Sequence, residues 1–211
     1  MADFTKARGQ LLDWTELVVK AADGSTSSPY VKSDALTITD DVSVTLYITV
    51  AHADTGAAAT SYVYVKCYSL PGTTATEDWR LCASLQAGGG TAVTEAVAAE
   101  SAAAQNTILV AAITDWDTGL QERIFVKDAT LVNSEVVTII GWNVDAGNDW
   151  YICAENLANT HADTADLFSG VDEMVVHVPE GSQAVKVIFT NSALAGIYAV
   201  RVDYEKVTDI E

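Results

Sequence analysis

The fold is indicated most clearly by residues 120–162, which read LQERIFVKDATLVNSEVVTIIGWNVDAGNDWYICAENLANTHA. Residues 123–127 alternate polar and apolar side chains, residues 135–140 are mostly β-branched, and residues 149–154 form a third extended segment. Asp, Asn, Ser and Gly residues, which favour tight turns, stand between these segments. The pattern predicts a meander of three β-strands.

Alternation of the same kind runs through the first part of the chain. Within residues 42–51 one face of the expected strand is apolar and the other is polar, the apolar face being Val42, Val44, Leu46, Ile48 and Val50. Residues 61–68 and 79–85 repeat the pattern after loops rich in glycine, alanine and threonine. These segments predict a sheet with one buried face.

The pattern resumes after Gly170, where residues 173–178, 184–190 and 198–205 are predicted strands. Three strands alone would make a marginal sheet, so we expect them to fold with the first part of the chain. The predicted fold is all-β: a jelly-roll-like β-sandwich interrupted by a small β-barrel-like insertion. The expected parts are an N-terminal arm (1–12), the sandwich (13–98 plus 170–208) and the inserted domain (99–169). A tandem of two β domains is the alternative.

Residues 87–106, AGGGTAVTEAVAAESAAAQN, differ from the segments before them. Three glycines followed by an alanine-rich run are compatible with a flexible linker and a short helix, because alanine has the highest helix propensity. An extended segment leading into a strand at residues 107–113 is the competing interpretation. Either one predicts a boundary here.

The composition is that of an acidic folded protein. The 211 residues include 29 acidic and 11 basic ones, for a net charge of −18, while hydrophobic residues make up 49%. No stripe of Lys or Arg is visible along the sequence, so the negative field disfavours nucleic acid and anionic membranes as partners. The same field favours solubility.

The cysteines and the N-terminus indicate synthesis in a reducing cytoplasm. Cys67, Cys82 and Cys153 are widely spaced, odd in number and flanked by apolar residues, which is typical of small buried thiols. The first residues lack the apolar segment of a signal peptide, and no later segment is long and apolar enough to span a bilayer. We therefore expect no signal peptide.

No residue is nominated as catalytic or cofactor-binding. His52 and His161 each precede Ala-Asp, which brings a carboxylate (Asp54 or Asp163) close to the imidazole, but solvated loops explain both pairs. His177 lies within a predicted strand and is expected to be structural. Serine-hydrolase and phosphate-binding glycine motifs are absent.

Two acidic loops are weak candidates for Ca²⁺, the only metal considered. Their side-chain oxygens recur at alternate positions, as calcium loops require, and come from Asp115, Asp117, Asp145 and Asp149. Neither loop has the terminal bidentate glutamate of a complete calcium site, and turn formation explains the same residues. The expectation is therefore no metal and no cofactor.

Four tryptophans lie at or near the ends of predicted strands: Trp79, Trp116, Trp142 and Trp150. Buried packing is the first interpretation of each, because tryptophan contributes a large apolar area. As a set, they would also serve as stacking platforms for sugar rings. They support the alternative function, a carbohydrate-binding module or a receptor-binding domain like a tail-fibre tip, with a saccharide as partner.

Residues 120–163 also carry a resemblance. A strand at residues 124–128, Asn133-Ser134-Glu135 opening the next strand, and the segment 157–163 after the third strand are similar to tailed-phage virion structural proteins, of the head-decoration or minor-capsid kind. The resemblance implies a non-enzymatic protein of the virion that decorates or stabilises a capsid. Its partners would be a major capsid or other virion protein and copies of itself, with a trimer favoured. The docking surface would be formed by edge strands together with residues 1–13. Residues 1–13 are expected to be polar and to stay detached from the first strand until assembly.

Overall fold

The computed structural model describes residues 3–18, 30–38, 41–57, 61–71, 78–111, 113, 122–145, 148–192 and 196–210. The predicted all-β class is confirmed, because these residues form antiparallel strands and one 3-10 turn, Leu131–Asn133. Within the described ranges, no helix has the length and apolar character needed to cross a bilayer.

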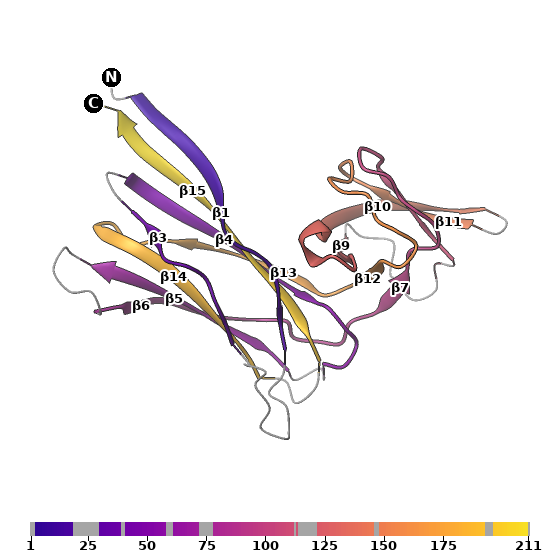
Figure 1. Ribbon diagram of the computed structural model, residues 1–211, viewed down its shortest axis with the longest axis horizontal. Coiled ribbons are helices and arrows are strands. Elements are labelled where there is room, and N and C mark those ends of the chain that lie inside the picture. Colours follow the sequence, from indigo (N-terminus) through magenta and orange to yellow (C-terminus); the bar gives the residue numbers. More distant parts are fainter. Residues whose placement is uncertain are drawn as a thin grey trace.

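Two antiparallel sheets form a sandwich (Figure 1). The first sheet has the order β1-β15-β4-β13, with the bounds β1 Asp3–Leu17, β15 Tyr198–Ile210, β4 Asp41–His52 and β13 Val171–His177. The second has the order β2-β14-β5-β6, with the bounds β2 Tyr30–Lys32, β14 Ser182–Asn191, β5 Val63–Pro71 and β6 Arg80–Ala87. The short strand β3, Leu36–Thr37, also pairs with β14.

The strand order is that of a jelly roll. The chain passes between the sheets repeatedly: β1, β4, β13 and β15 belong to the first sheet, and β2, β5, β6 and β14 belong to the second, where, among the described strands, only β5 and β6 form a hairpin within one sheet. Each sheet thus pairs strands from the beginning of the chain with strands from its end, as two Greek keys require. The predicted jelly-roll-like sandwich is therefore confirmed.

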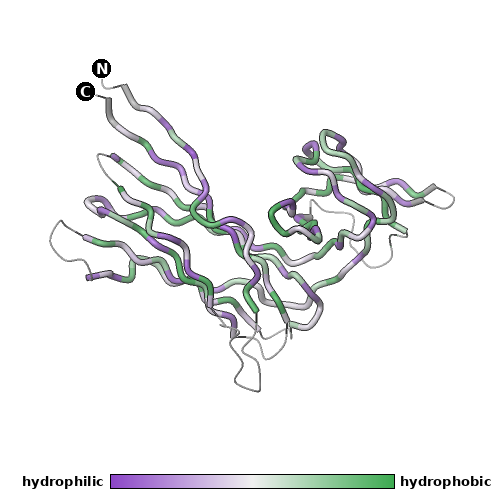
Figure 2. Tube along the Cα trace, in the orientation of Figure 1, coloured by the Kyte–Doolittle hydropathy of each residue, from purple (hydrophilic) through white to green (hydrophobic). Residues whose placement is uncertain are grey.

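Alternating apolar residues hold the sheets together. Leu46, Ile48 and Val50 of β4 are at most 1% exposed, and they share one core with Val187 and Phe189 of β14. The residues between them face outward, which appears in Figure 2 as alternating colours along the strands. Tyr198, Val200 and Val202 of β15 lie in the same core, whereas Val42, the first residue of the expected apolar face, is exposed.

The third sheet lies between β6 and β13 in the sequence and curls into a half-barrel. Its order is β7-β12-β9-β10-β11-β8, with the bounds β7 Thr94–Ala96, β12 Asp166–Phe168, β9 Glu122–Lys127, β10 Glu135–Asp145, β11 Asn148–Cys153 and β8 Thr107–Val110. The two edge strands approach at a bridge between Val97 and Val110. The predicted three-strand meander is its centre, β9-β10-β11.

The half-barrel is docked on the end of the first sheet. A small apolar cluster joins Trp14, Ala51 and Ala199 of the sandwich to Phe125 and Phe168 of the half-barrel. The rings of Trp14 and Phe125 are 4.6 Å apart. At the base of the half-barrel, where the chain enters and leaves, the backbone N–H of Val93 donates to Ser169 Oγ (2.8 Å) and the N–H of Ser169 donates to the Val93 carbonyl (3.0 Å).

The structure differs from the sequence analysis at two places. The expectation of a detached arm is wrong for residues 3–12, because they belong to β1 and pair with β15 from the Asp3–Ile210 position onward. The chain joins the third sheet before residue 99, since β7 pairs with β12. Residues 87–106 contain no helix, so the extended interpretation holds. The division of the chain into a sandwich domain and an inserted domain stays a prediction.

Replacing Phe189 by alanine should lower the free energy of unfolding by about 3–5 kcal/mol, because the ring is fully buried between the sheets. Urea denaturation followed by tryptophan fluorescence measures the loss. Val175→Ala is the control: Val175 is 57% exposed on β13, and its loss should cost less than about 0.5 kcal/mol. Equal losses in the two variants would contradict the assigned core.

Candidate functional site

The three histidines occupy different environments. His161 is fully buried in the half-barrel, and its Nε2 lies 2.8 Å from Oε1 of Glu135, while Asp128 Oδ2 is 3.7 Å from Nδ1. Its carboxylate neighbours are therefore these two residues of the meander, and not the Asp163 that the sequence suggested. His177 is exposed on β13, with Nδ1 3.1 Å from Thr45 Oγ1.

Glu135 holds a loop of the half-barrel. Its two carboxylate oxygens accept hydrogen bonds from the backbone N–H groups of Ala158 (3.0 Å) and Asn159 (2.9 Å), in addition to the contact with His161. Burial alone would raise the pKa of Glu135, but the His161 ring and the two N–H groups overcome it and hold the pKa below its ordinary value. The cluster is a structural tie between β10 and residues 157–161.

His52 lies at the junction between the sandwich and the half-barrel. It is 1% exposed, and its ring is 4.8 Å from that of Tyr198, whose hydroxyl donates to the Gly88 carbonyl. Burial lowers the pKa of His52, although the carboxylates of Asp172 and Asp54 oppose this effect. At Gly170 a Cβ atom would lie 2.6 Å from the His52 ring, so the chain needs glycine here.

The cysteines and the acidic loops show no assembled reactive or metal site in the described residues. Burial raises the pKa of the Cys67 and Cys153 thiols to about 12, which keeps them protonated. Oδ2 of Asp149 accepts the Ile113 N–H (2.7 Å). The side chains of Asp115, Asp117 and Asp145 lie outside the described residues. Among the described residues, no group of three or more His, Cys, Asp or Glu side chains is arranged to hold a metal ion.

The tryptophans do not form one platform. Trp79 belongs to the sandwich, where the ammonium of Lys186 lies 3.9 Å above its ring. Trp142 pairs with Tyr151 and Trp150 pairs with Asn143, so alternation along β11 places the two tryptophans on opposite faces of the β10-β11 pair. Trp142 is 44% exposed. Trp116 lies outside the described residues.

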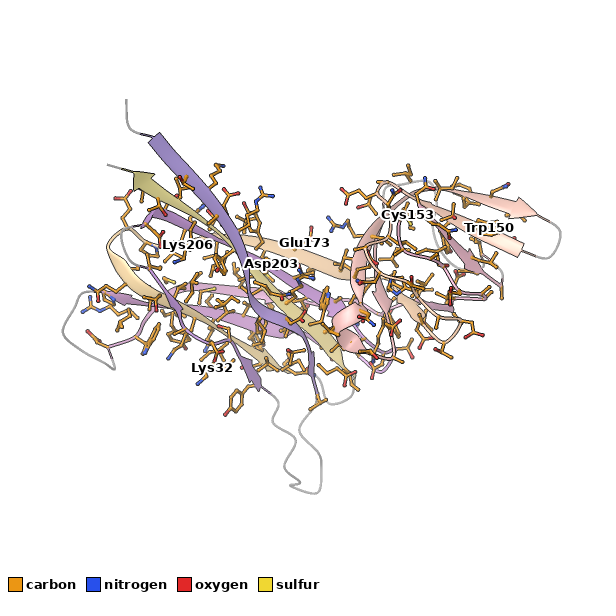
Figure 3. The ribbon with its side chains drawn as sticks, turned by 45° about the horizontal axis from the view of Figure 1, so that its top comes forward. Lys32, Trp150, Cys153, Glu173, Asp203 and Lys206 are labelled. Carbon is orange, nitrogen blue, oxygen red and sulfur yellow. The ribbon has the colours of Figure 1, made fainter. Side chains whose placement is uncertain are left out.

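A hollow of about 550 Å³ lies on the outer face of the first sheet, lined by Arg8, Gly9, Gln10, Tyr47, Arg201, Asp203 and Tyr204. A smaller one of about 180 Å³ shares Arg201 and Asp203 and reaches Glu135 of the half-barrel. Figure 3 shows Asp203 and Glu173 on this side of the sandwich. Arg201 binds Asp203 through two hydrogen bonds, and Arg123 binds Glu173 through two more. The cationic groups of this face are thus paired with carboxylates.

The outer face of the second sheet has another character. Cross-strand neighbours place Tyr30, Thr190 and Tyr64 in one row, Lys32, Ile188 and Lys66 in the next, and Lys186, Tyr68 and Leu81 in a third. We call these nine residues, with Trp79, the lysine–tyrosine face. Tyr30, Leu81 and Tyr64 are 56%, 53% and 44% exposed. It is a broad surface of aromatic, aliphatic and cationic groups.

Sequence reasoning missed this face because its lysines come from three strands that are distant in the chain. No Lys or Arg stripe exists in the sequence, yet β2, β5 and β14 lie side by side and bring Lys32, Lys66 and Lys186 together. One signal was available: the five strands of the second sheet contain no Asp or Glu in a chain with 29 acidic residues.

No protein-family model and no curated protein sequence matches the chain. Solved structures with some similarity include VP17, a capsid protein of bacteriophage P23-77, with 9% identity and a TM-score of 0.19 over 98% of both chains. A chain of the P23-77 VP16–VP17 complex, of the two major capsid proteins, has 11% identity and a TM-score of 0.20 over 99% of this chain and 100% of that one. A chain of infectious bursal disease virus, Gx strain, has 8% identity and a TM-score of 0.24.

The present chain spans 43% of the bursal disease virus chain, and that match covers 99% of the present chain. Viral capsid proteins are thus among its structural neighbours.

Glu135→Gln should lower the free energy of unfolding at pH 7 by about 1–3 kcal/mol, because it weakens charge-assisted hydrogen bonds from a largely buried carboxylate to the loop at residues 157–161. The folded state lowers the pKa of this carboxyl, so its contribution is complete above the ordinary value of 4.5 and is lost as the pH falls through the lowered pKa. The difference between wild type and variant should therefore shrink in acid.

Urea denaturation of both proteins between pH 7 and pH 3 tests this. Glu155→Gln makes the same charge change at an exposed position of the same half-barrel and should leave stability within about 0.5 kcal/mol of wild type. A difference between wild type and Glu135→Gln that stays constant over the whole pH range would contradict the role assigned to the carboxylate.

Proposed function

We propose that the chain is a non-enzymatic structural protein of a tailed-phage virion, which decorates or stabilises the capsid through contacts with capsid protein and with its own copies. A jelly-roll sandwich is common in viral capsid domains, but the same fold serves lectins, so fold alone does not decide. The observation that carries the proposal is the free outer edge of β1 in the first sheet.

We call residues 3–10 of β1, which pair with residues 203–210 of β15, the ribbon. The other side of β15 pairs with β4 as far as Thr208, so the ribbon is the outer margin of the first sheet, and both chain ends lie at its corner (Figure 1). Residues 5–8 and 10 are exposed, and the apolar core of the sandwich takes in β1 only from Leu11 onward. This segment of β1 therefore adds little to the core.

β1 is the edge strand of the first sheet, and no second strand pairs with its outer side in the described part of the chain. A free edge offers backbone N–H and C=O groups to a strand of another molecule, which gives main-chain hydrogen bonds without requiring particular side chains. Docking of the ribbon on a capsid protein or a neighbouring copy would use this edge. Repetition of the contact around an axis would give a closed oligomer, with a trimer favoured.

A variant that lacks residues 1–9 should lose the contact at the β1 edge and keep its fold. We expect the full-length protein to form a trimer, a larger ring or a sheet in light scattering and negative-stain images, and the truncated protein to form smaller assemblies and to keep a cooperative unfolding transition. Lys6→Ser combined with Arg8→Ser is the control. It removes the exposed charges that pair with Glu205 but keeps the backbone, and should assemble as the wild type does.

Unchanged assembly of the truncated protein would remove the ribbon from the mechanism. A full-length protein that is monomeric at every concentration and binds a glycan through the exposed Trp142 would replace the proposal by the saccharide-binding alternative.

A further inference from the structure

The lysine–tyrosine face contains the unpaired cations of the described structure. Seven basic side chains form ion pairs with carboxylates: Lys6, Arg8, Arg80, Arg123, Lys127, Arg201 and Lys206. Lys32, Lys66 and Lys186 have no such partner among the described residues, although the net charge of the chain is −18. The three lysines without a carboxylate partner in the described part of the chain thus lie on one face.

The positive charges of neighbouring lysines on this face repel one another. Partial desolvation and the nearby charge of Lys32 both lower the pKa of Lys186. The strands around them supply no acidic side chain, whereas those of the first sheet contain Asp3, Asp13, Glu16, Asp41, Asp172, Glu173, Asp203, Glu205 and Asp209. Uncompensated charge beside exposed tyrosines is a poor arrangement for a surface that faces only water, and a good one for a surface that receives an acidic partner.

The half-barrel has the complementary charge. Residues 88–170 contain only two basic side chains, Arg123 and Lys127, and both are paired with glutamates of the sandwich. Its exposed carboxylates include Glu100, Glu155 and Asp163, which we call the acidic barrel surface. The Ser101–His161 bridge and the bond from the Ala104 N–H to the Leu157 carbonyl hold the two segments that carry these residues together.

We propose that the lysine–tyrosine face of one copy binds the acidic barrel surface of a second copy. The lysines would meet the carboxylates, and the tyrosines and Leu81 would supply the apolar contact area that hot spots of protein interfaces require. The proposal rests on the proposed function, to which it adds a defined contact between copies.

The geometry makes this contact head-to-tail. Lys32 lies on the opposite side of the sandwich from Asp203 and Glu173, and the half-barrel is docked on the side of the latter two (Figure 3). One copy therefore presents its two complementary surfaces in different directions, so each bound copy leaves one of each free. Such heterologous contacts close into a ring or continue as an open helical filament.

Two variants with opposite charge changes test the contact. The face variant carries Lys32→Gln, Lys66→Gln and Lys186→Gln, and the barrel variant carries Glu100→Gln, Glu155→Gln and Asp163→Asn. Sedimentation velocity in low salt should show assemblies of the wild type that weaken at least tenfold on raising the salt, and smaller assemblies for each variant alone. An equimolar mixture should form larger assemblies than either variant alone, because each variant retains the surface that the other lacks.

The barrel variant also controls for net charge. It carries three fewer negative charges than the wild type, so a general effect of net charge would strengthen its association, whereas loss of the proposed contact weakens it. Assemblies of wild-type size in both variants would overturn the inference and leave the proposed function standing. Loss of assembly on truncation of the ribbon, with no loss in either charge variant, would assign the contact between copies to β1. A monomeric wild type would overturn the inference too. So would binding of duplex DNA or phosphatidylglycerol vesicles to the wild type in place of a second copy.

Discussion

The apolar layer between the two sheets is the constraint on which the remaining structure depends. β4 and β15 place Leu46, Ile48, Val200 and Val202 on one side of this layer, and β14 places Phe189 on the other. Since side chains alternate along a strand, burial of these positions fixes which residues face outward. The outer surfaces of the molecule are therefore a direct result of packing inside the sandwich.

The content of acidic and basic side chains differs between the outer surfaces of the two sheets. On the first sheet, acidic and basic groups come together, and pairs such as Arg201 with Asp203 neutralise one another. The second sheet has no carboxylate in its strands, and the half-barrel has almost no cations. A chain that is strongly acidic as a whole is thus built from parts with different electrostatic character, and its average charge describes none of them well.

Local alternation made much of the fold predictable. β4 and β15 are recognisable because Val44 to Val50 and Tyr198 to Val202 alternate strictly, and their number and spacing indicated a sandwich with an insertion. The sequence did not predict the part of β1 at residues 3–10. Residues 5–9, TKARG, show no regular alternation of apolar and polar side chains, and β1 is held there by pairing with β15 at the other end of the chain. The His161–Glu135 contact, across 26 residues, and the lysine–tyrosine face likewise arise only when distant strands meet.

The hydrogen bonds between Val93 and Ser169 connect residues that are 76 positions apart. In the unfolded chain, pairing β4 with β13 must close a loop that contains the entire insertion, and the entropy cost of closure grows with the logarithm of loop length. Once the half-barrel has formed, its base brings the chain before β13 back to the chain after β6, and the loop that remains is much shorter. Prior folding of the insertion would then lower the entropy cost of forming the longest-range contacts of the sandwich. The jelly roll would therefore form faster when the half-barrel folds first than when it folds last.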